Sequence, residues 1–278
     1  MKKEATLVVA VYNAVRYLEF ILIALRRQSL VNFELIIADD GSQADIKALV
    51  DRARGDAPFP ITHLWQPDEG FRKNAILNKA IEASHTGYLI FIDGDCLPHH
   101  HFVKDHWIHR KANSVLCGRR VNFSRQITDR LRVEDIRSGR FERMSVNILL
   151  DGLMARSSNL EDALRIESPL LRTMLHRNKA RILGCNFSVD KKLLERINGF
   201  NEEYEAPGIG EDSDIAFRLE LVGARMVTLR YLAILYHLYH PATVADDVNK
   251  KIYERVVATR EVMCRKGLRN LDLKLQKT

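Results

Sequence analysis

The fold is decided by Tyr88-Leu89-Ile90-Phe91-Ile92-Asp93-Gly94-Asp95, an apolar run that ends in two carboxylates. This pattern is typical of a buried strand that delivers acidic side chains to the edge of a sheet. Two aspartates separated by one glycine can approach the same divalent cation, because such hard ions prefer oxygen ligands. A cation held there could bind a diphosphate, which indicates sugar-nucleotide chemistry. Asp-Gly is also an ordinary turn dipeptide, so the interpretation depends on the rest of the chain.

Strands and helices alternate on the N-terminal side of this run. The apolar periodicity predicts strands at 5–11, 33–38 and 61–65 and helices at 13–28, 43–54 and 72–84. Strands that alternate with helices of this length imply right-handed βαβ units, and therefore a parallel sheet covered by helices on both faces. We expect an α/β fold.

Polar side chains follow three of these strands, at the point where each strand ends. They are Tyr12-Asn13, Asp39-Asp40 and Asp93-Gly94-Asp95. Ligands of parallel sheets bind outside the carboxyl ends of the strands, so these clusters are expected to share one site. The first strand ends without a glycine-rich loop, which argues against a dinucleotide fingerprint and against a P-loop.

The second half of the chain is organised differently. Residues 122–181 are rich in Arg, Leu, Glu and Ser and are predicted to form a helical insertion or lid. Strand character resumes at 182–189, and we expect further strands at 225–229 and 232–236. A short helix is expected at 190–197, and Gly210-Glu211-Asp212-Ser213-Asp214 is expected to begin another. The C-terminal residues suggest a basic amphipathic helix.

Composition and charge limit the classes of function. The chain has 278 residues, of which 46% are hydrophobic and 28% charged, as in soluble globular proteins. Neither a membrane-spanning run nor a signal-peptide core is evident, so we expect a cytoplasmic protein. The net charge of +7 suits an anionic partner: nucleotide phosphates, a phospholipid surface or nucleic acid. Nucleic acid is disfavoured, because no nucleic-acid module is evident.

Several smaller features have a structural interpretation. The four cysteines are widely spaced and contain no Cys-x-x-Cys pair, so they are predicted to be buried free thiols: Cys96, Cys117, Cys185 and Cys264. Adjacent residues of a helix point in different directions, so His99-His100-His101 is interpreted as a helix start with solvated histidines rather than as a metal cluster.

Together these segments resemble the inverting glycosyltransferases of family 2, which have the A-type nucleotide-diphospho-sugar transferase fold. The matching segments are 7–13, 34–42, 70–74 and 90–95. Residues 184–188, 198–202 and 210–214 are similar to the galactosyltransferase-like half of bacterial chondroitin-type polymerases. The resemblance implies a single domain with a Rossmann-like, mostly parallel sheet flanked by helices, a helical insertion and a C-terminal helix. Its parts would be a nucleotide-sugar-binding half (1–121), the insertion or lid (122–181), an acceptor and catalytic-base half (182–245) and a basic helical extension (246–278).

The resemblance assigns the donor site to the first half. Tyr12 would stack near the uracil of a UDP-sugar and Asp40 would hydrogen-bond the base, while Asp39 turns away and supports the loop. Taken alone, these residues would be read as a strand-end aromatic and a turn. Arg72 would lie near the phosphates or brace the loop of Asp93. The donor site implied by the resemblance comprises Ala10, Tyr12, Asp40, Arg72, Asn78, Asp93 and Gly94.

The resemblance also implies a metal site. Asp93 would face the ribose, and Asp95 would bind the Mn²⁺ or Mg²⁺ ion that bridges the two phosphates. His240 is the better match for a further ligand and His237 is the reserve, although a lone histidine is more often structural. An imidazole beside carboxylates favours Mn²⁺ over Mg²⁺.

Catalysis is assigned by resemblance to the second half. Inversion requires a base that accepts the proton of the acceptor hydroxyl, and Asp212 is assigned this role. Glu211 and Asp214 would position the acceptor or the base, and Asn186 would support the acceptor. Acidic residues in the first turn of a helix are also expected for capping alone.

The resemblance thus implies a metal-dependent, inverting transfer of a hexose or N-acetylhexosamine from a UDP-sugar. The acceptor would be a glycan or lipid-linked oligosaccharide in the synthesis of bacterial lipopolysaccharide or capsule. The basic insertion and tail would favour peripheral association with the inner face of an anionic plasma membrane. Two alternatives remain: a sugar-nucleotide pyrophosphorylase, which should carry a glycine-rich loop, and a non-catalytic glycan- or membrane-surface-binding protein, which should have lost acidic residues from the motifs.

Overall fold

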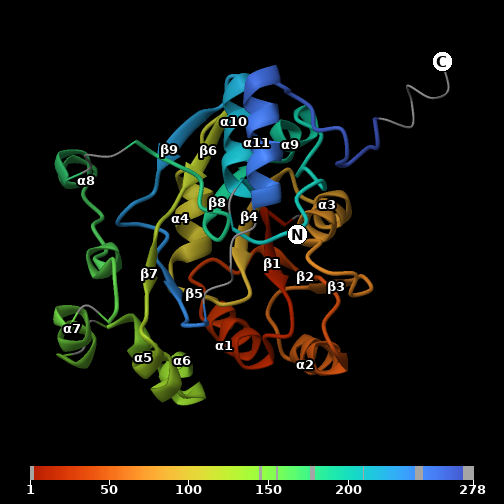
Figure 1. The fold of residues 1–278 in the computed structure, drawn as a ribbon. Helices are drawn as coiled ribbons and strands as arrows, with labels where there is room; N and C mark the ends of the chain where they lie inside the picture. Colours follow the sequence, from red (N-terminus) through yellow and green to blue (C-terminus); the bar gives the residue numbers. More distant parts are fainter. Residues whose placement is uncertain are drawn as a thin grey trace.

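One sheet of seven strands forms the centre of the molecule, in the order β3-β2-β1-β4-β8-β6-β9 (Figure 1). The structure is a computed structural model and describes residues 3–143, 146–154, 156–175, 179–208, 210–241 and 247–271. The strands of the sheet are β1 (Ala5–Val11), β2 (Phe33–Asp39), β3 (Ile61–Trp65), β4 (Tyr88–Asp93), β6 (Ser114–Cys117), β8 (Phe187–Asp190) and β9 (Arg225–Thr228).

The expected mostly parallel sheet is confirmed. The pairings β1–β2, β1–β4, β2–β3 and β6–β9 are parallel, and only β8 runs against its two neighbours. Every residue of β1 and β2 is buried. Helices cover both faces of a parallel sheet, and its central strands therefore consist of continuous apolar runs.

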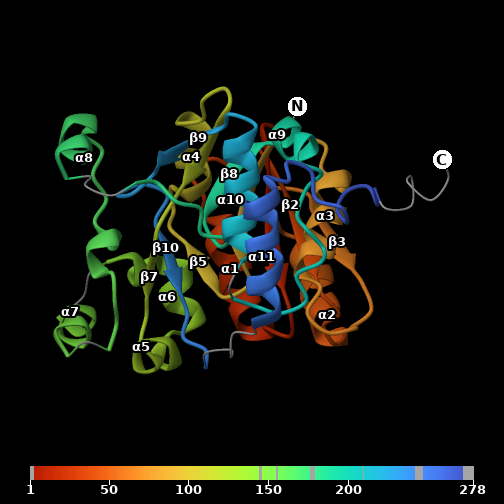
Figure 2. The ribbon, with the colours of Figure 1, turned by 45° about the horizontal axis from the view of Figure 1, so that its top comes forward.

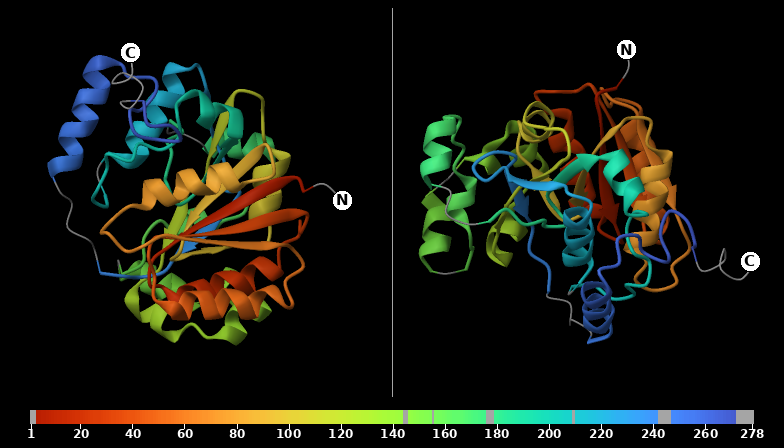
Figure 3. Two further views of the ribbon diagram at one scale, coloured as in Figure 1. Left: turned by 90° about the vertical axis from the view of Figure 1, so that its right-hand side faces the viewer. Right: turned by 90° about the horizontal axis from the view of Figure 1, so that it is seen from above.

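Two layers of helices cover the sheet. The helices α1 (Val15–Arg26) and α2 (Ala44–Arg54) contribute to a hydrophobic cluster on one face, together with α4 (Phe102–Ile108). A separate cluster on the other face contains side chains of α3 (Lys73–Ala83), α9 (Lys191–Arg196) and α10 (Glu211–Leu221). Figure 3 shows the orange α3 on one side of the red strands and the red α1 on the other.

A second, smaller sheet extends the carboxyl edge of the first. It contains β5 (Cys96–Pro98), β10 (Leu235–His237) and β7 (Arg120–Asn122) in the order β5-β10-β7. The expected strand at 232–236 therefore begins three residues later and belongs to this sheet. The expected strand at 182–189 is also shorter, because the chain forms strand only from Phe187.

The described residues between 123 and 181 form loops and short helices. These are α5 (Arg125–Arg130), α6 (Val133–Ser138), the 3-10 helices η1 (Arg140–Glu142) and η2 (Leu160–Ala163), α7 (Val146–Leu153) and α8 (Pro169–Leu175). In Figures 1 and 2, α7 and α8 stand apart from the sheet on the side opposite α2 and α3. The described part of the chain contains no helix that is long and apolar enough to cross a membrane.

The expected C-terminal helix is present as α11 (Asp247–Thr259), which lies beside α10 (Figure 2). It is shorter than the 246–278 extension expected from the sequence. Residues 260–271 contain no further helix, and positions 246 and 272–278 lie outside the described residues.

Two local interpretations are corrected and one is confirmed. Asn13 does not cap α1: it has φ 50°, and its side chain accepts a hydrogen bond from the backbone N–H of Gln43. The three histidines 99–101 are partly buried rather than solvated. Nε2 of His99 lies 3.8 Å from the carboxylate of Glu142, and the rings of His100 and His101 make hydrogen bonds to Arg27 and Ser29. All four cysteines are buried free thiols, as expected.

Candidate active site at the carboxyl edge of the sheet

The ends of β1, β2 and β4 bring the sequence-predicted side chains to one edge. Ala10 of β1 pairs in register with Ala38 of β2 and with Asp93 of β4, so the three strands end at the same level. Gly94 follows β4 and passes close to β1, where a Cβ atom would lie 2.8 Å from the carbonyl oxygen of Ala10. Glycine therefore allows the chain to turn at this point and present Asp95 beyond the edge.

The small sheet brings the histidines to Asp95. His237 pairs with Cys96, and the backbone N–H of Leu238 donates to the carbonyl oxygen of Asp95 at 2.8 Å. As a result, the Oδ2 atom of Asp95 lies 3.1 Å from Nε2 of His240 and 3.5 Å from Nε2 of His237. One potential ligand atom from each of these three residues lies within 4.8 Å of the other two.

This donor set fits a divalent metal ion. His240 has its Nδ1 atom 2.8 Å from the carbonyl oxygen of Pro241, an arrangement that places the Nδ1–H on that oxygen and directs Nε2 toward Asp95, where a metal would replace its proton. The hydrogen bond to Asp95 raises the pKa of His240. Burial works to raise the pKa of Asp95, but the hydrogen bonds from both histidines outweigh it and hold that pKa well below its usual range. Asp95 is therefore an anion at neutral pH, as a metal ligand must be.

A buried ammonium group connects the aspartate motif to the acidic helix. Lys73 begins α3, and its Nζ atom lies 2.9 Å from Oδ1 of Asp93 and 3.5 Å from Oε1 of Glu211. Burial opposes the charge of Lys73, but the nearby carboxylates prevail and raise its pKa well above the ordinary value. Sequence reasoning missed this residue. The available signal was its unfavourable position as a cation in the first turn of a helix.

Asp212 lies in the first turn of α10, opposite a glycine backbone. Its Oδ2 atom accepts a hydrogen bond of 2.7 Å from the N–H of Gly184. A Cβ atom on residue 184 would lie 2.2 Å from Oδ1 of Asp212, so only glycine permits this approach. Burial raises the pKa of Asp212, while the charges of Lys73 and Arg120 and the hydrogen bond from Gly184 oppose the rise. A carboxylate with a raised pKa is better suited to accept a proton.

Arg120 is a second residue that sequence reasoning missed, and no sequence motif marks it. It lies on β7 and is half-buried, and its guanidinium contacts only the Sγ atom of Cys185, at 3.7 Å, among the described residues. Its positive charge acts to lower the pKa of both Asp212 and His240. Burial lowers the pKa of Arg120, but the nearby Cys185, Cys96 and Asp95 raise it overall, so the guanidinium is charged and can attract a bound anion.

Asp40 directly follows β2 and is buried. It accepts hydrogen bonds from Nε2 of Gln66 at 2.6 Å and from the backbone N–H of Arg72 at 2.8 Å. Lys79 in turn donates to Oε1 of Gln66 at 3.0 Å. Burial raises the pKa of Asp40, and these hydrogen bonds oppose the rise.

The two other polar residues at these strand ends have different positions. Tyr12 is exposed, and its hydroxyl donates to Asp68 at 2.9 Å. Asp39 supports the loop after β2, as expected. It is fully buried and contacts the N–H of Ser42 and Nε2 of His63, both at 2.8 Å.

Some candidate residues face away from the site. The side chain of Arg72 pairs with Glu69 at the surface, so Lys73 and not Arg72 contacts Asp93. Asn78 is buried and its amide bonds the backbone N–H and carbonyl of Phe200 as well as Glu202, so its expected contact with a nucleotide is corrected to a structural role.

Two candidate acceptor residues are also buried. Asp214 forms an ion pair with Arg218, in which both side chains are almost inaccessible to solvent. Asn186 donates to the carbonyl oxygens of Arg119 and Ala233 and lies 3.0 Å from Nε2 of His106. Neither side chain is available to touch an acceptor, and each instead supports the segments around it.

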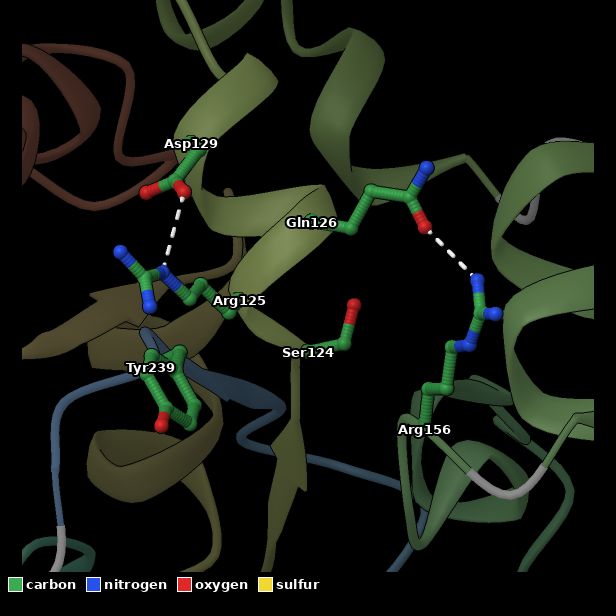
Figure 4. A pocket seen from close by; sticks show the side chains of 6 residues that line it. All are labelled: Ser124, Arg125, Gln126, Asp129, Arg156 and Tyr239. Carbon is green, nitrogen blue, oxygen red and sulfur yellow. Dashed lines mark hydrogen bonds and ion pairs between the residues drawn. The ribbon is translucent and has the colours of Figure 1, made fainter.

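An open pocket of about 560 Å³ lies beside the strand that carries the histidines (Figure 4). Tyr239 lines one side, adjacent in sequence to His240. In Figure 4 the side chains of Gln126 and Arg156 meet across the pocket, and Arg125 lies beside Tyr239. The lining residues are Ser124, Arg125, Gln126, Asp129, Arg156 and Tyr239. Hydroxyl, amide and guanidinium groups beside an aromatic ring can bind a polar ligand that carries negative charge.

The chain is similar to known glycosyltransferases. It is 24% identical over 242 residues to chondroitin synthase of Escherichia coli, a match that covers 85% of this chain and 35% of that protein. It is also 38% identical over 91 residues to the putative glycosyltransferase EpsH of Bacillus subtilis, covering 32% of this chain and 25% of that protein. The chain therefore spans about a third or less of the length of these relatives.

Solved structures share the fold. Staphylococcus aureus TarS 1–349 in complex with UDP has a TM-score of 0.60 and 16% identity, covering 95% of this chain and 67% of that one. The mannosyltransferase PcManGT of Pyrobaculum calidifontis, solved with GDP-Man and Mn²⁺, has a TM-score of 0.55 and 17% identity, covering 86% of this chain and 57% of that one.

Two family models match the chain. Residues 168–241 match the model described as the N-terminal domain of galactosyltransferase, in agreement with the resemblance of the second half. Residues 6–196 match the model of glycosyl transferase family 2, which covers the sheet edge and Asp93-Gly94-Asp95. The chain is therefore a member of glycosyl transferase family 2.

Proposed function

We propose that the protein is a metal-dependent, inverting glycosyltransferase that moves a hexose or N-acetylhexosamine from a UDP-sugar to a glycan or lipid-linked oligosaccharide. The grouping of Asp95, His237 and His240 at the carboxyl edge of the sheet carries the proposal. This edge is where parallel sheets bind ligands. The relatives chondroitin synthase and TarS, the latter solved with UDP, support a polysaccharide product and a UDP donor.

The donor nucleoside is assigned to the carboxyl ends of β1 and β2. Asp40 is buried there and would accept a hydrogen bond from the base of the nucleotide. Tyr12 is exposed, so its ring is free to stack on the uracil. Ala10 and Gly94 lie close together at this edge, and we assign them to the donor site because small residues would let the donor approach the backbone. We assign Asp93 to the ribose side of the donor.

Asp95 and His240 would hold a divalent metal, with His237 as the third ligand. A metal bound there supplies Lewis-acid stabilisation of the departing diphosphate. Two imidazole nitrogens favour Mn²⁺ over Mg²⁺, because Mg²⁺ prefers oxygen ligands. The mannosyltransferase solved with Mn²⁺ supports the same choice.

We assign the role of catalytic base to Asp212. Its carboxylate would accept the proton of the acceptor hydroxyl while that oxygen attacks the anomeric carbon from the face opposite the leaving group. Gly184 orients the carboxylate through its N–H, and Lys73 fixes Glu211 beside it. Arg120 lies close enough to act electrostatically on both Asp212 and His240, and its unpaired charge would neutralise part of the diphosphate.

The parts of the chain are assigned accordingly. Residues 1–121 bind the donor, 182–245 carry the base and contact the acceptor, 122–181 form the lid and 246–278 form a basic extension. The pocket beside Tyr239 would receive the acceptor. The proposed setting is the synthesis of bacterial lipopolysaccharide or capsule at the cytoplasmic face of the plasma membrane, where the net charge of +7 favours an anionic surface.

Hydrolysis of a panel of UDP-sugars, with and without Mn²⁺, tests the proposal. We expect slow, EDTA-sensitive release of UDP from one sugar class, and its loss in Asp95→Asn. The matched control is Asp56→Asn, which removes an exposed carboxylate outside the site. Product analysis by NMR with a glycan acceptor then tests inversion of the anomeric centre.

Three outcomes would contradict parts of the proposal. Donor binding without turnover under all conditions would favour a non-catalytic binding protein. Formation of UDP-sugar from UTP and a sugar phosphate would favour a pyrophosphorylase. Full UDP-sugar hydrolysis by Asp95→Asn would contradict the assignment of Asp95 as a metal ligand.

A further inference from the structure

The two histidines of the proposed metal site are held in different ways. His237 is the last residue of β10 and is fixed by the sheet, because it pairs with Cys96 of β5 and with Asn122 of β7. His240 follows three residues later and lies outside these pairings. Its position therefore depends on the contacts that the chain makes between the end of β10 and the imidazole.

Both backbone polar groups of Tyr239, the residue before His240, are bonded to side-chain hydroxyl groups. The N–H of Tyr239 donates to Oγ1 of Thr128 at 2.9 Å, and its carbonyl oxygen accepts a hydrogen bond of 2.7 Å from the hydroxyl of Tyr17. Thr128 belongs to α5 of the insertion, 111 residues away in the sequence, and Tyr17 belongs to α1, 222 residues away. Because peptide units are planar, two bonds on one residue restrict the direction in which the chain enters His240.

The Thr128 hydroxyl is itself held in a fixed place. Thr128 is fully buried, and Nη2 of Arg16 lies 3.0 to 3.3 Å from the carbonyl oxygens of Thr128, Asp129 and Leu131 at the end of α5. A guanidinium in this place satisfies carbonyl groups that the last turn of a helix leaves unpaired. Arg16 and Tyr17 are consecutive residues of α1, so one turn of α1 holds both α5 and Tyr239.

This arrangement acts on the imidazole next to Tyr239. Nε2 of His240 lies 3.1 Å from Oδ2 of Asp95, and Leu238 is bonded to the backbone of Asp95 on the other side of Tyr239. A metal ligand is most effective when its position is fixed before the metal arrives. The bonds to Tyr239 supply this restraint at the one stretch of the histidine segment that lies beyond the sheet.

We propose that Thr128 and Tyr17 are positioning residues for His240. Their hydroxyl groups fix the backbone of Tyr239 and thereby hold the imidazole beside Asp95. The inference rests on the proposed metal site and extends it to two residues outside the ligand set, one of them in the insertion.

The insertion helix α5 thereby takes part in assembling the metal site. The same helix lines the pocket beside Tyr239 that is proposed for the acceptor, as Figure 4 shows. One short helix thus borders the proposed acceptor pocket and also holds the chain that carries a proposed metal ligand.

A purely structural role is the alternative, because a buried threonine hydroxyl with a hydrogen bond also stabilises a fold. The two roles differ in their dependence on His240. A positioning residue affects the affinity for metal only while His240 is present to be positioned. A residue that merely stabilises the fold has the same effect on metal affinity with and without this imidazole.

Mn²⁺ affinity, measured by electron paramagnetic resonance on the metal-free full chain, tests the proposal. Thr128→Val keeps the branched shape and removes the hydroxyl, and Tyr17→Phe removes the other hydroxyl at the surface. We expect each substitution to weaken Mn²⁺ binding about three- to tenfold, and Thr128→Ser, which retains a hydroxyl, to restore most of the affinity. The amide of Tyr239 should also exchange its hydrogen faster in Thr128→Val, even without metal.

The matched control is Thr86→Val. Thr86 is also buried, and its hydroxyl donates to the carbonyl oxygen of Tyr88 at 3.0 Å, at the end of β4 opposite to Asp93. This control should lower the midpoint of thermal unfolding as Thr128→Val does, and it should leave the Mn²⁺ affinity unchanged. In a His240→Ala background, Thr128→Val should weaken the residual Mn²⁺ binding by less than about twofold, because coupled residues are not additive.

Two results would overturn the inference and leave the proposed function standing. The first is Mn²⁺ binding that neither Thr128→Val nor Tyr17→Phe weakens. The second is an equal loss of affinity from Thr128→Val with and without His240. Since Tyr17→Phe changes a residue at the surface, it carries the test if Thr128→Val does not fold. Absence of Mn²⁺ binding in the unchanged protein would instead overturn the proposed metal site, and this inference with it.

Discussion

The ammonium group of Lys73 lies 2.9 Å from the carboxylate of Asp93, at the end of the strand that decides the fold. The same nitrogen lies 3.5 Å from Glu211, which begins the acidic helix α10. One buried cation therefore connects the donor half of the chain to the half that carries the proposed base. This contact sets the distance between two motifs that lie more than a hundred residues apart in the sequence.

Removing the charge of Lys73 should weaken the contact between the two halves of the chain. We expect Lys73→Met to lower the free energy of unfolding by about 3 kcal/mol, because Asp93 and Glu211 would face each other in a partly buried site without a counterion. Urea denaturation followed by circular dichroism measures this loss. The control is Lys47→Met, which breaks an exposed i,i+4 pair with Asp51 and should change stability by less than about 1 kcal/mol. Equal effects of the two substitutions would contradict the proposed bridge.

Metal binding should depend on Asp95 and His240. Titration calorimetry with Mn²⁺ is expected to show a single site in the unchanged protein, weakened at least about tenfold by either Asp95→Asn or His240→Ala. His85→Ala is the control, because His85 is an exposed histidine whose side chain pairs with Glu34, away from Asp95. A His240 variant that retained the full Mn²⁺ affinity would leave His237 as the histidine ligand.

The affinity for Mn²⁺ should fall as the pH is lowered. The hydrogen bond to Asp95 raises the pKa of His240, so its proton persists to a higher pH than the ordinary value of about 6.5. Metal must displace this proton, and the loss of affinity should therefore begin near neutral pH. In the metal-free protein the raised pKa of His240 stabilises the fold at low pH. This contribution to the free energy of unfolding is fully present below the pKa of the unfolded state and is lost as the pH rises through the folded-state pKa.

Calorimetric titrations between about pH 5.5 and 8 measure this dependence. His240→Gln should flatten the profile as well as weaken binding, because the titrating imidazole is gone. A profile with the same midpoint in His240→Gln would assign the dependence to another group.

Neighbouring carboxylates of α10 should give opposite phenotypes. Asp212→Asn is expected to reduce kcat by a factor of about 10² to 10⁴ with donor affinity little changed. Its amide oxygen can still accept the hydrogen bond from Gly184. Asp214→Asn should instead lower stability by about 3 kcal/mol, since it weakens a buried ion pair with Arg218. Its folded fraction should keep a nearly normal kcat. Single-turnover kinetics and thermal unfolding of both variants separate these effects. An Asp214→Asn variant with unchanged stability and a low kcat would instead support a role of Asp214 in the acceptor site.

Arg120 should distinguish a diphosphate from a nucleoside. We expect Arg120→Met to weaken UDP binding about tenfold and to leave uridine binding unchanged, because only UDP offers phosphate oxygens to the guanidinium. The control is Arg119→Met, a neighbouring residue whose guanidinium bonds the carbonyl oxygens of Gly118 and Arg181. Competition binding with UDP and uridine measures the difference. Parallel losses for both ligands would show that Arg120 acts on the fold of the site rather than on the phosphates.

Local sequence patterns were sufficient for the first half of the fold. The boundaries of β1 and β3 agree with the structure, and α3 differs by one residue at each end. Central strands of a parallel sheet are continuous apolar runs, and the helices between them have a 3.6-residue period. These signals are local, so they can be read without knowing the partner segments.

The second half was harder to predict because its strands are short. β5, β7 and β10 each contain only three residues, which is too few to show an alternating pattern. Their sheet exists because distant segments pair, with His237 opposite Cys96 and opposite Asn122. This pairing is the step that brings the histidines to Asp95.

The sequence by itself determined the fold class, the family and the acidic motifs that reach the edge of the sheet. The tertiary structure alone decided which polar residues face that edge and which face the core. Asn78 hydrogen-bonds the backbone of Phe200, and Asp214 forms an ion pair with Arg218. In contrast, Lys73 forms an ion pair with Asp93 at the edge, and Arg120 has no carboxylate within ion-pair distance among the described residues. The physical reason is that a buried polar side chain must point toward its hydrogen-bond partner, so the position of the partner determines its orientation. Most of these partners come from distant parts of the chain, and no local pattern records them.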